Sequence, residues 1–195
     1  MQFTNFPSAK IFPLQPISWS YIAGYFDGEG CFILSIYQEK RIKFINPDID
    51  GYILRPQIYL QSYDLEVLSA IQTFLRLEDV SVSKFMRIKK KQNGMTQDSI
   101  GIAVCSYGGV ARFIEKISPH IIQKRPQLIL FNDLMKIYNQ RPLARRKRMK
   151  NLPPQHKWDK ISWLKAMEVV DKINSYKSRK RGKYNLVFFQ KLWNI

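Results

Sequence analysis

The chain has 195 residues, of which 45% are hydrophobic and 13% aromatic, so it is long and apolar enough to bury the core of one domain. It carries 32 Lys and Arg against 15 Asp and Glu, a formal net charge of +17. This composition excludes a disordered chain, and the lack of any run of 18 apolar residues excludes a membrane-spanning helix. We expect no signal peptide, because no basic region followed by an apolar stretch opens the sequence.

The cysteine and histidine content limits the metal and redox chemistry. Cys31 and Cys105 cannot build a disulfide scaffold or a four-ligand zinc site by themselves, and the only histidines are His120 and His156. We therefore expect two buried thiols in a reducing, intracellular compartment, either an organelle or a microbial cytoplasm. The sequence does not choose between these two.

The positive charge is concentrated near the C-terminus. Residues 1–140 hold 16 Lys and Arg against 12 Asp and Glu, whereas residues 141–195 hold 16 against 3. Two basic runs, Arg141–Lys150 and Lys177–Lys183, account for most of this excess. Lysines and arginines that meet phosphates release counterions, so this pattern favours nucleic-acid binding. A solvated face or a membrane-surface patch is the alternative, but no lipidation motif accompanies the runs.

The first part of the chain predicts an extended arm and then a short helix. Three prolines in residues 1–16 indicate the arm, and residues 18–28 predict a helix that Ser18 caps. Small side chains recur on one face of this helix at steps of four, at Ser20, Gly24 and Gly28. Because glycine in a helix costs about 1 kcal/mol relative to alanine, we interpret this face as a close-packing surface for a second helix.

The pattern then alternates between strands and helices. Period-two alternation predicts strands at 31–41 and 52–61, helical periodicity follows at 63–77, and a second hairpin is predicted at 80–91 and 96–106. Further helices are expected at 109–117, after Pro119, and at 158–176. This order predicts an α+β fold with a four-stranded antiparallel sheet and helices on one sheet face.

The other sheet face is predicted to be polar and to suit base edges in a major groove. Arg and Lys match guanine, and Gln matches adenine. In the second hairpin we expect Val82, Met86 and Ile88 to pair with Ile100, Ile102 and Val104 on the core face. An ordinary solvated face is the alternative. The candidate DNA-binding residues on the strands are Ser35, Tyr37, Glu39, Arg41, Arg55, Gln57, Tyr59, Arg87, Lys89 and Lys91.

The junction between the first helix and the first strand, YIAGYFDGEG at Tyr21–Gly30, is the most specific feature. It resembles the signature of the LAGLIDADG homing endonucleases, whose αββαββα order also matches the order derived above. The resemblance covers about residues 17–185 and implies a curved four-stranded sheet that forms a DNA-binding saddle. It also implies one domain at 17–185, with 141–185 as its basic helical part and 186–195 as a C-terminal segment.

The chemistry of this junction supports the resemblance. Asp27 and Glu29 end a helix, where the macrodipole already places about half a negative charge, so a cation is needed there. Two such helices packed together bring four carboxylates close, and oxygen ligands select a hard ion such as Mg²⁺. A polar turn is the alternative interpretation of Asp27–Gly30.

The resemblance implies roles for individual residues. Glu29 binds the metal with help from the Gly28 carbonyl, while Ser20, Gly24, Asp27 and Gly28 form a dimer interface. Gln61 holds active-site water, or else it is one more base-reading or solvent-facing side chain. Lys124 stands near the scissile phosphate, with a phosphate clamp as the alternative and a register that the adjacent Arg125 leaves uncertain by one. The C-terminal loop that grips the DNA backbone corresponds to Lys177, Arg179 and Lys180.

Only one copy of the motif is present, and single-motif members of the family form homodimers. The sequence therefore predicts a magnesium-dependent, intron-type homing endonuclease that makes a staggered break in a long, nearly palindromic DNA duplex. Its partners are this DNA and a second copy of the chain, without a membrane or a small-molecule cofactor. The alternative is an RNA maturase or another non-cleaving relative that assists intron splicing. A plain basic RNA-associated protein is a third hypothesis, which the acidic junction disfavours.

Overall fold

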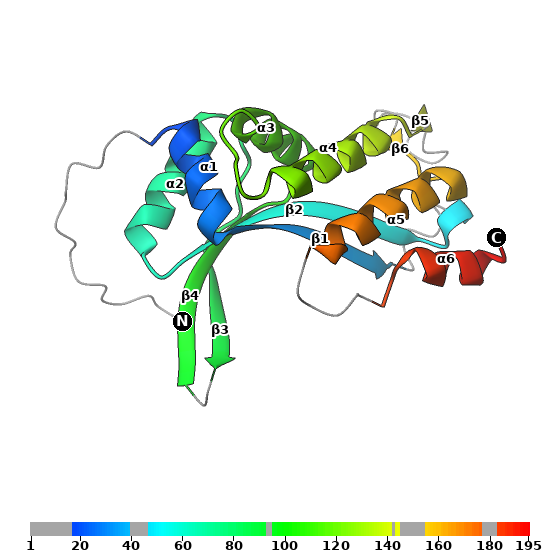
Figure 1. Cartoon of the computed structure of the whole chain (residues 1–195), viewed down its shortest axis with the longest axis horizontal. Coiled ribbons are helices and arrows are strands. Elements are labelled where there is room, and N and C mark those ends of the chain that lie inside the picture. The colour runs from blue at the N-terminus through cyan, green and yellow to red at the C-terminus, as the bar shows by residue number, and fades with distance from the viewer. Residues whose placement is uncertain (1–16, 40–46, 93–94, 142, 145–154, 177–182) are drawn as a thin grey trace.

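The computed structural model of the chain describes residues 17–39, 47–92, 95–141, 143–144, 155–176 and 183–195 (Figure 1). The expected arm at 1–16 lies outside the described residues, as do Arg41, Lys177, Arg179, Lys180 and the basic run Arg145–Lys150. The elements are α1 (Trp19–Glu29), β1 (Gly30–Gln38), the 3₁₀ helix η2 (Pro47–Ile49), β2 (Tyr52–Ser62), α2 (Leu65–Leu77), β3 (Met86–Gln92), β4 (Met95–Val104), α3 (Tyr107–Ile117), α4 (Arg125–Asn139), β5 (Leu143–Ala144), β6 (Gln155–His156), α5 (Lys160–Ser175) and α6 (Leu186–Trp193).

The helix α1 forms where the sequence predicts it. The Ser18 hydroxyl accepts a hydrogen bond from the Tyr21 backbone N–H at 3.2 Å and so caps the first turn. Ile22, Ala23 and Phe26 are fully buried, which makes this the core-facing side of the helix. None of the helices in the described ranges has the length and hydropathy that a membrane crossing requires.

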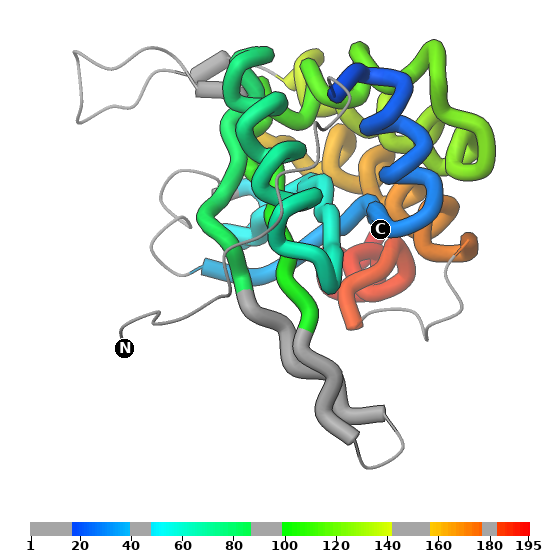
Figure 2. The backbone as a smooth tube through the Cα atoms, turned by 90° about the vertical axis from the view of Figure 1, so that its left-hand side faces the viewer, coloured from blue at the N-terminus to red at the C-terminus, as the bar shows by residue number. Residues whose placement is uncertain are grey.

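The four strands β1–β4 form one antiparallel sheet in the order β1-β2-β4-β3. The α+β fold with a four-stranded antiparallel sheet and helices over one face is therefore confirmed. Figure 1 shows β1 and β2 running below α4 and α5, while β4 and β3 extend away from the helices. The second view shows α1, in blue, next to the green helices that follow β4, in agreement with the contacts between α1 and α3 (Figure 2).

Two hydrophobic clusters fix the helices to the sheet. The first contains Phe26 and Phe32 together with residues of α2, α3 and α4, and the second joins Trp163 of α5 and Phe189 of α6 to β2. Leu34 packs against both clusters and links them. The segment 186–195 was predicted without a helix, but α6 forms there because Phe189 is fully buried in the second cluster.

The pairing of the second hairpin differs from the prediction by one residue. Met86 pairs with Gly101 and Ile88 with Ser99, while Val82 precedes β3. The expected pairing of these apolar residues with Ile100, Ile102 and Val104 is therefore wrong. Instead, Arg87 lies opposite Ile100, Lys89 opposite Asp98 and Lys91 opposite Thr96. Residues 80–85, predicted to begin this strand, precede β3 rather than form part of it.

Candidate active site and nucleic-acid interface

The glycine face of α1 is open in the single chain. Ser20, Tyr21, Gly24 and Gly28 are exposed, and a Cβ placed on Gly24 or Gly28 would meet no atom within 4 Å. The fold of one chain therefore does not require glycine at these two positions. Since glycine inside a helix costs about 1 kcal/mol relative to alanine, the reason for these residues lies outside the chain's own packing.

The last glycine of the motif has a different environment. A Cβ on Gly30 would lie 2.0 Å from Cδ2 of the Phe26 ring, which occupies the space that a side chain would need. Gly30 also caps α1, because its N–H donates to the Phe26 carbonyl oxygen. Gly30 thus allows the chain to pass directly from helix to strand beside a buried aromatic ring.

The Asp27 carboxylate joins the end of α1 to the start of α4. Its Oδ2 accepts hydrogen bonds from the N–H groups of Ile122 at 2.7 Å and Gln123 at 3.1 Å, and Oδ1 accepts one from Lys124 N–H at 2.9 Å. The half-buried carboxylate thereby satisfies backbone donors that precede the first turn of α4. Asp27 is engaged within its own chain.

The Lys124 side chain at the start of α4 in turn contacts the end of α1. Its Nζ donates to the Phe26 carbonyl oxygen at 2.9 Å and also to the Asp27 carbonyl oxygen, so the ammonium caps the C-terminus of α1. Partial burial lowers the pKa of Lys124, while the nearby Asp27 opposes that change. Lys124 therefore lies at the end of α1, where the nearby Glu29 carboxylate also acts to raise the pKa of Lys124.

Glu29 and Gln61 lie at the same end of the β1–β2 pair. Gly30 pairs with Leu60, so Glu29 directly precedes and Gln61 directly follows this pair. The exposed Glu29 makes no hydrogen bond or ion pair with another described residue. Gln61 is fixed, because its side-chain Nε2 donates to the Ser99 hydroxyl at 2.8 Å and its backbone carbonyl oxygen accepts from the Tyr25 hydroxyl at 2.7 Å.

The hydroxyl of Tyr25 lies beside Glu29 and Gln61. Tyr25 was not predicted from the sequence to belong to the site. Burial raises the pKa of Tyr25, and the nearby Glu29 carboxylate raises it further. Tyr25 stacks on Tyr21 with ring centroids 6.3 Å apart. Its position within the motif was visible, but its bond to Gln61 depends on how α1 packs against β2.

The donor set of one chain does not hold a metal alone. The described residues contain no group of three or more His, Cys, Asp or Glu side chains placed to bind an ion. Glu29 offers an exposed carboxylate beside the backbone oxygens that end α1, and such oxygen donors suit Mg²⁺ with phosphate and water as further ligands. The residues present fit a magnesium site that other molecules complete.

The outward face of β1 and β2 has the predicted composition. Leu54, Ile58 and Leu60 are buried, while the alternate residues Arg55, Gln57 and Tyr59 face the other way. Ser35 pairs with Arg55 across the two strands. Tyr37 lies on the same face, because the Arg55 guanidinium is 5.6 Å from the centre of its ring.

Gln57 is held by two neighbours. The Ser35 hydroxyl donates to its Oε1 at 3.3 Å, and its Nε2 donates to the Cys105 Sγ at 3.0 Å. Cys105 is exposed and Cys31 is half-buried, so the expectation of two buried thiols is wrong. The Cys105 thiol follows β4 and reaches Gln57 through the β2–β4 pairing, which the sequence alone does not show. Tyr59 also reaches β4, where its hydroxyl lies over Gly101.

The remaining predicted residues lie at the strand ends and in the hairpin. Glu39 is half-buried just after β1, and its N–H donates to the Gly51 carbonyl at 3.1 Å. Arg87, Lys89 and Lys91 are in β3. The structure therefore groups Ser35, Tyr37, Arg55, Gln57 and Tyr59 on one sheet face. Glu39 follows two residues after Tyr37, and the residues of β3 are separated from β2 by β4.

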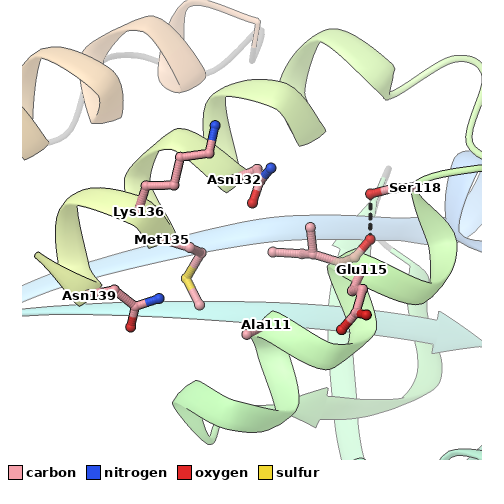
Figure 3. Close-up of a pocket in the computed structure, with 8 residues that line it drawn as sticks. Ala111, Glu115, Ser118, Asn132, Met135, Lys136 and Asn139 are labelled. Carbon is pink, nitrogen blue, oxygen red and sulfur yellow. Dashed lines mark hydrogen bonds between the residues drawn. The ribbon is translucent and has the colours of Figure 1, made fainter.

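A separate cleft of about 340 Å³ lies between α3 and α4 (Figure 3). Glu115, Asn132, Lys136 and Asn139 supply its polar lining. Lys136 is already paired with Asp133 at 3.0 Å. The cleft contains none of the predicted site residues.

Comparison with known proteins finds one family model that matches part of the chain. The sequence model described as LAGLIDADG endonuclease matches residues 22–103, from α1 to β4. A comparison with curated protein sequences gives no match.

Solved structures share the fold of the chain. A structure of the homing endonuclease I-CvuI in complex with a DNA target is 16% identical, with a TM-score of 0.61 over 90% of this chain and 92% of that one. The archaeal intron-encoded homing endonuclease I-Vdi141I complexed with DNA is also 16% identical, with a TM-score of 0.62 over 89% of this chain and 92% of that one. I-SmaMI, bound to an uncleaved DNA target, has 16% identity and a TM-score of 0.54, and the match covers 93% of this chain but 49% of that one.

Proposed function

We propose that this chain is a LAGLIDADG endonuclease, namely a homodimeric, site-specific DNA endonuclease of the intron-homing type. It makes a staggered double-strand break in a long, nearly palindromic duplex. The observation that carries the proposal is the end of α1, where an open glycine face leads directly to the exposed carboxylate of Glu29. An open face of this kind supports close contact with a second copy of the same helix.

Dimerisation follows from the need to cut both strands. One chain supplies a single exposed Glu29, and two chains related by a twofold axis supply one on either side of the paired α1 helices. The match to half the length of I-SmaMI supports this arrangement, because one copy of the present fold accounts for only half of that chain. Because a twofold-symmetric protein reads two inverted half-sites, we expect its DNA target to be nearly palindromic.

Each residue of the site has a proposed role. Glu29 and the Gly28 carbonyl would hold Mg²⁺, with phosphate oxygens and water as further ligands. The ion supplies charge neutralisation at the phosphate and a more acidic water. Gln61, fixed by Ser99, orients a water molecule, and the Lys124 ammonium stabilises charge at the phosphate.

The polar sheet face is the proposed DNA interface. Ser35, Tyr37, Arg55, Gln57 and Tyr59 lie together on the face of β1 and β2 opposite the hydrophobic core, and this placement supports major-groove reading. The net charge of +17 supports strong, salt-dependent attraction to the phosphate backbone. The DNA backbone is proposed to receive further contacts from Lys177, Arg179 and Lys180. The base-reading surface is proposed to extend to Glu39, Arg41, Arg87, Lys89 and Lys91.

A cleavage assay on the full-length chain tests the proposal. A randomised duplex library is incubated with the protein, with and without Mg²⁺, and cut molecules are sequenced. We expect cleavage only with Mg²⁺, and we expect Glu29→Gln to reduce the rate at least 100-fold, an effect typical of losing a key catalytic group. Glu168→Gln, which alters an exposed carboxylate on α5, is the matched control and should cut at the normal rate.

Two results would contradict the proposal in different ways. Normal cleavage by the Glu29→Gln variant would show that the site is assigned to the wrong residue. Tight binding to a structured intron RNA without cleavage of any duplex would favour the alternative function, an RNA maturase.

A further inference from the structure

We infer that Arg55 and Gln57 set the base preference of the sheet face, and that each half-site carries a G·C pair and an A·T pair two base-pair steps apart. This inference rests on the proposed function, because it takes DNA as the ligand. The two residues lie two positions apart on β2, on the face opposite the core. Each is held by neighbours in a way that leaves suitable hydrogen-bonding groups free.

Gln57 retains the pair of groups that adenine requires. A glutamine amide has two N–H donors and two acceptor lone pairs. One donor is used by the Cys105 Sγ at 3.0 Å, and one lone pair by the Ser35 hydroxyl at 3.3 Å. One donor and one acceptor remain, and these match N7 and the N6 amino group of adenine in the major groove.

The residue opposite Gln57 suits the thymine of the same base pair. Ile33 pairs directly with Gln57 across β1 and β2, so the two residues occupy the same sheet face. Ile33 is half-buried, which leaves part of its apolar side chain accessible. Thymine carries a methyl group in the major groove, and an apolar side chain is the natural contact for it. An amide beside an aliphatic side chain thus favours A·T.

Arg55 has the features of a guanine reader. Its side chain is exposed, and its guanidinium carbon lies 5.6 Å from the centre of the Tyr37 ring. No carboxylate among the described residues pairs with it. Contact with the ring restrains the planar group while its N–H donors stay available, and these donors fit O6 and N7 of guanine.

The spacing of the two residues fixes the spacing of the base pairs. Residues two apart on a strand are separated by about 6.6–6.8 Å. Successive bases along one DNA strand rise by about 3.4 Å, so two steps cover about 6.8 Å. Where β2 follows the major groove, Arg55 and Gln57 therefore face base pairs with one intervening pair.

Selection of bound duplexes tests the inference separately from cleavage. The full-length protein is incubated with a randomised duplex library without divalent metal, and bound molecules are sequenced. We expect a guanine and an adenine with one intervening position in each half-site. Gln57→Glu should shift the second position from adenine to cytosine, because a carboxylate accepts from the cytosine amino group. The change in preference should be about 5- to 150-fold.

The companion variants separate base reading from charge. Arg55→Gln should remove the guanine preference by a similar factor while the adenine preference stays. Lys165→Ala, which removes one positive charge from the exposed side of α5, should leave both preferences unchanged. Circular dichroism of each variant confirms that the fold is retained.

The outcomes distinguish the two proposals. If duplexes are enriched but show no guanine and adenine at this spacing, or if Gln57→Glu leaves the pattern unchanged, the inference is wrong and the proposed function stands. If the wild-type protein enriches no duplex at all, both proposals fail.

Discussion

The three glycines near the end of α1 differ in what surrounds them. Gly24 and Gly28 face open space, whereas a side chain on Gly30 would overlap the Phe26 ring. Glycine therefore has two separate roles here: Gly24 and Gly28 allow close approach of another helix, and Gly30 allows the local turn into β1. Only the role of Gly30 can be tested by measuring the stability of a single chain.

Replacing Gly30 should destabilise the fold. Gly30→Ala forces the Phe26 ring to move within a packed cluster, and overpacking of this kind typically costs about 1–3 kcal/mol. Urea unfolding measures the free energy of unfolding of the variant. In a Phe26→Leu background the cost of Gly30→Ala should be smaller than in the wild type. Equal costs in both backgrounds would show that the ring contact is not the cause.

Tyr107 gives the chain a pH-dependent contribution to stability. Its hydroxyl donates to the Met135 carbonyl at 2.7 Å, and burial raises the pKa of Tyr107 far above its usual range. Because the folded pKa is raised, this stabilisation is complete below the unfolded pKa of about 10 and is lost as the pH rises above it.

The stability difference between wild type and Tyr107→Phe should therefore shrink with rising pH. We expect the wild type to be more stable at pH 8 and the gap to narrow at pH 10.5, measured by denaturant unfolding at each pH. Tyr176→Phe, at an exposed side chain, should show no such trend. A gap that is constant between the two pH values would contradict the assignment.

The helices α1 and α4 cap each other through Asp27 and Lys124. The carboxylate accepts from the N–H groups that lead into α4, and the ammonium donates to the carbonyls that end α1. Each charge thus meets the end of the opposing helix that it stabilises. This reciprocal contact fixes the end of α1, on which Glu29 lies.

Loss of Asp27 should weaken the contact between these helices. Asp27→Ala leaves the N–H groups of Ile122, Gln123 and Lys124 without their acceptor, and we expect a loss of about 1–3 kcal/mol in the free energy of unfolding. Asp133→Ala is the matched control, because its ion pair with Lys136 is exposed and worth little. Equal stabilities of the two variants would contradict the proposed importance of the contact.

Local patterns predicted most helices and strands but not the pairing of the second hairpin. Alternation is clear in β2, where every second residue from Tyr52 to Leu60 is buried, and in the second half of β1, where Leu34 and Ile36 alternate with Ser35 and Tyr37. In β3, Ile88 is surrounded by charged residues, so a shift of one position changes the apolar pattern very little. The observed register, in which Gln92 pairs with Met95, cannot be read from that pattern.

The candidate site was predictable where its residues are close in sequence. Glu29, Gly28 and Asp27 belong to one motif, and the pairing of two neighbouring strands places Gln61 at the same strand end as Glu29. The bonds of Lys124 to the Phe26 and Asp27 carbonyls could not be foreseen, because they arise from packing between α1 and α4, far apart in the sequence. The contact of Gln57 with Cys105 depends in the same way on sheet order.

Assembly of the proposed dimer can be separated from folding of the chain. Gly24→Ala should raise the free energy of unfolding of the monomer by about 0.5–1 kcal/mol, because alanine is the better helix former and space is available. The same substitution should weaken dimerisation about 5- to 150-fold through crowding between the paired helices. Analytical ultracentrifugation measures the association directly.

The matched control lies on another helix. A Cβ on Gly108 in α3 also meets no atom within 4 Å, so Gly108→Ala should leave dimerisation unchanged. Opposite effects on folding and association are expected only at α1. Unchanged dimerisation of the Gly24→Ala variant, or a monomer at every concentration of the wild type, would contradict the proposed assembly.

The position of Cys105 also makes the native protein suitable for spectroscopy. The chain has two cysteines, and Cys105 is exposed whereas Cys31 is half-buried. A maleimide dye should therefore attach preferentially to Cys105, next to the Gln57 amide. Its fluorescence would follow ligand arrival at the sheet in real time, without an engineered labelling position.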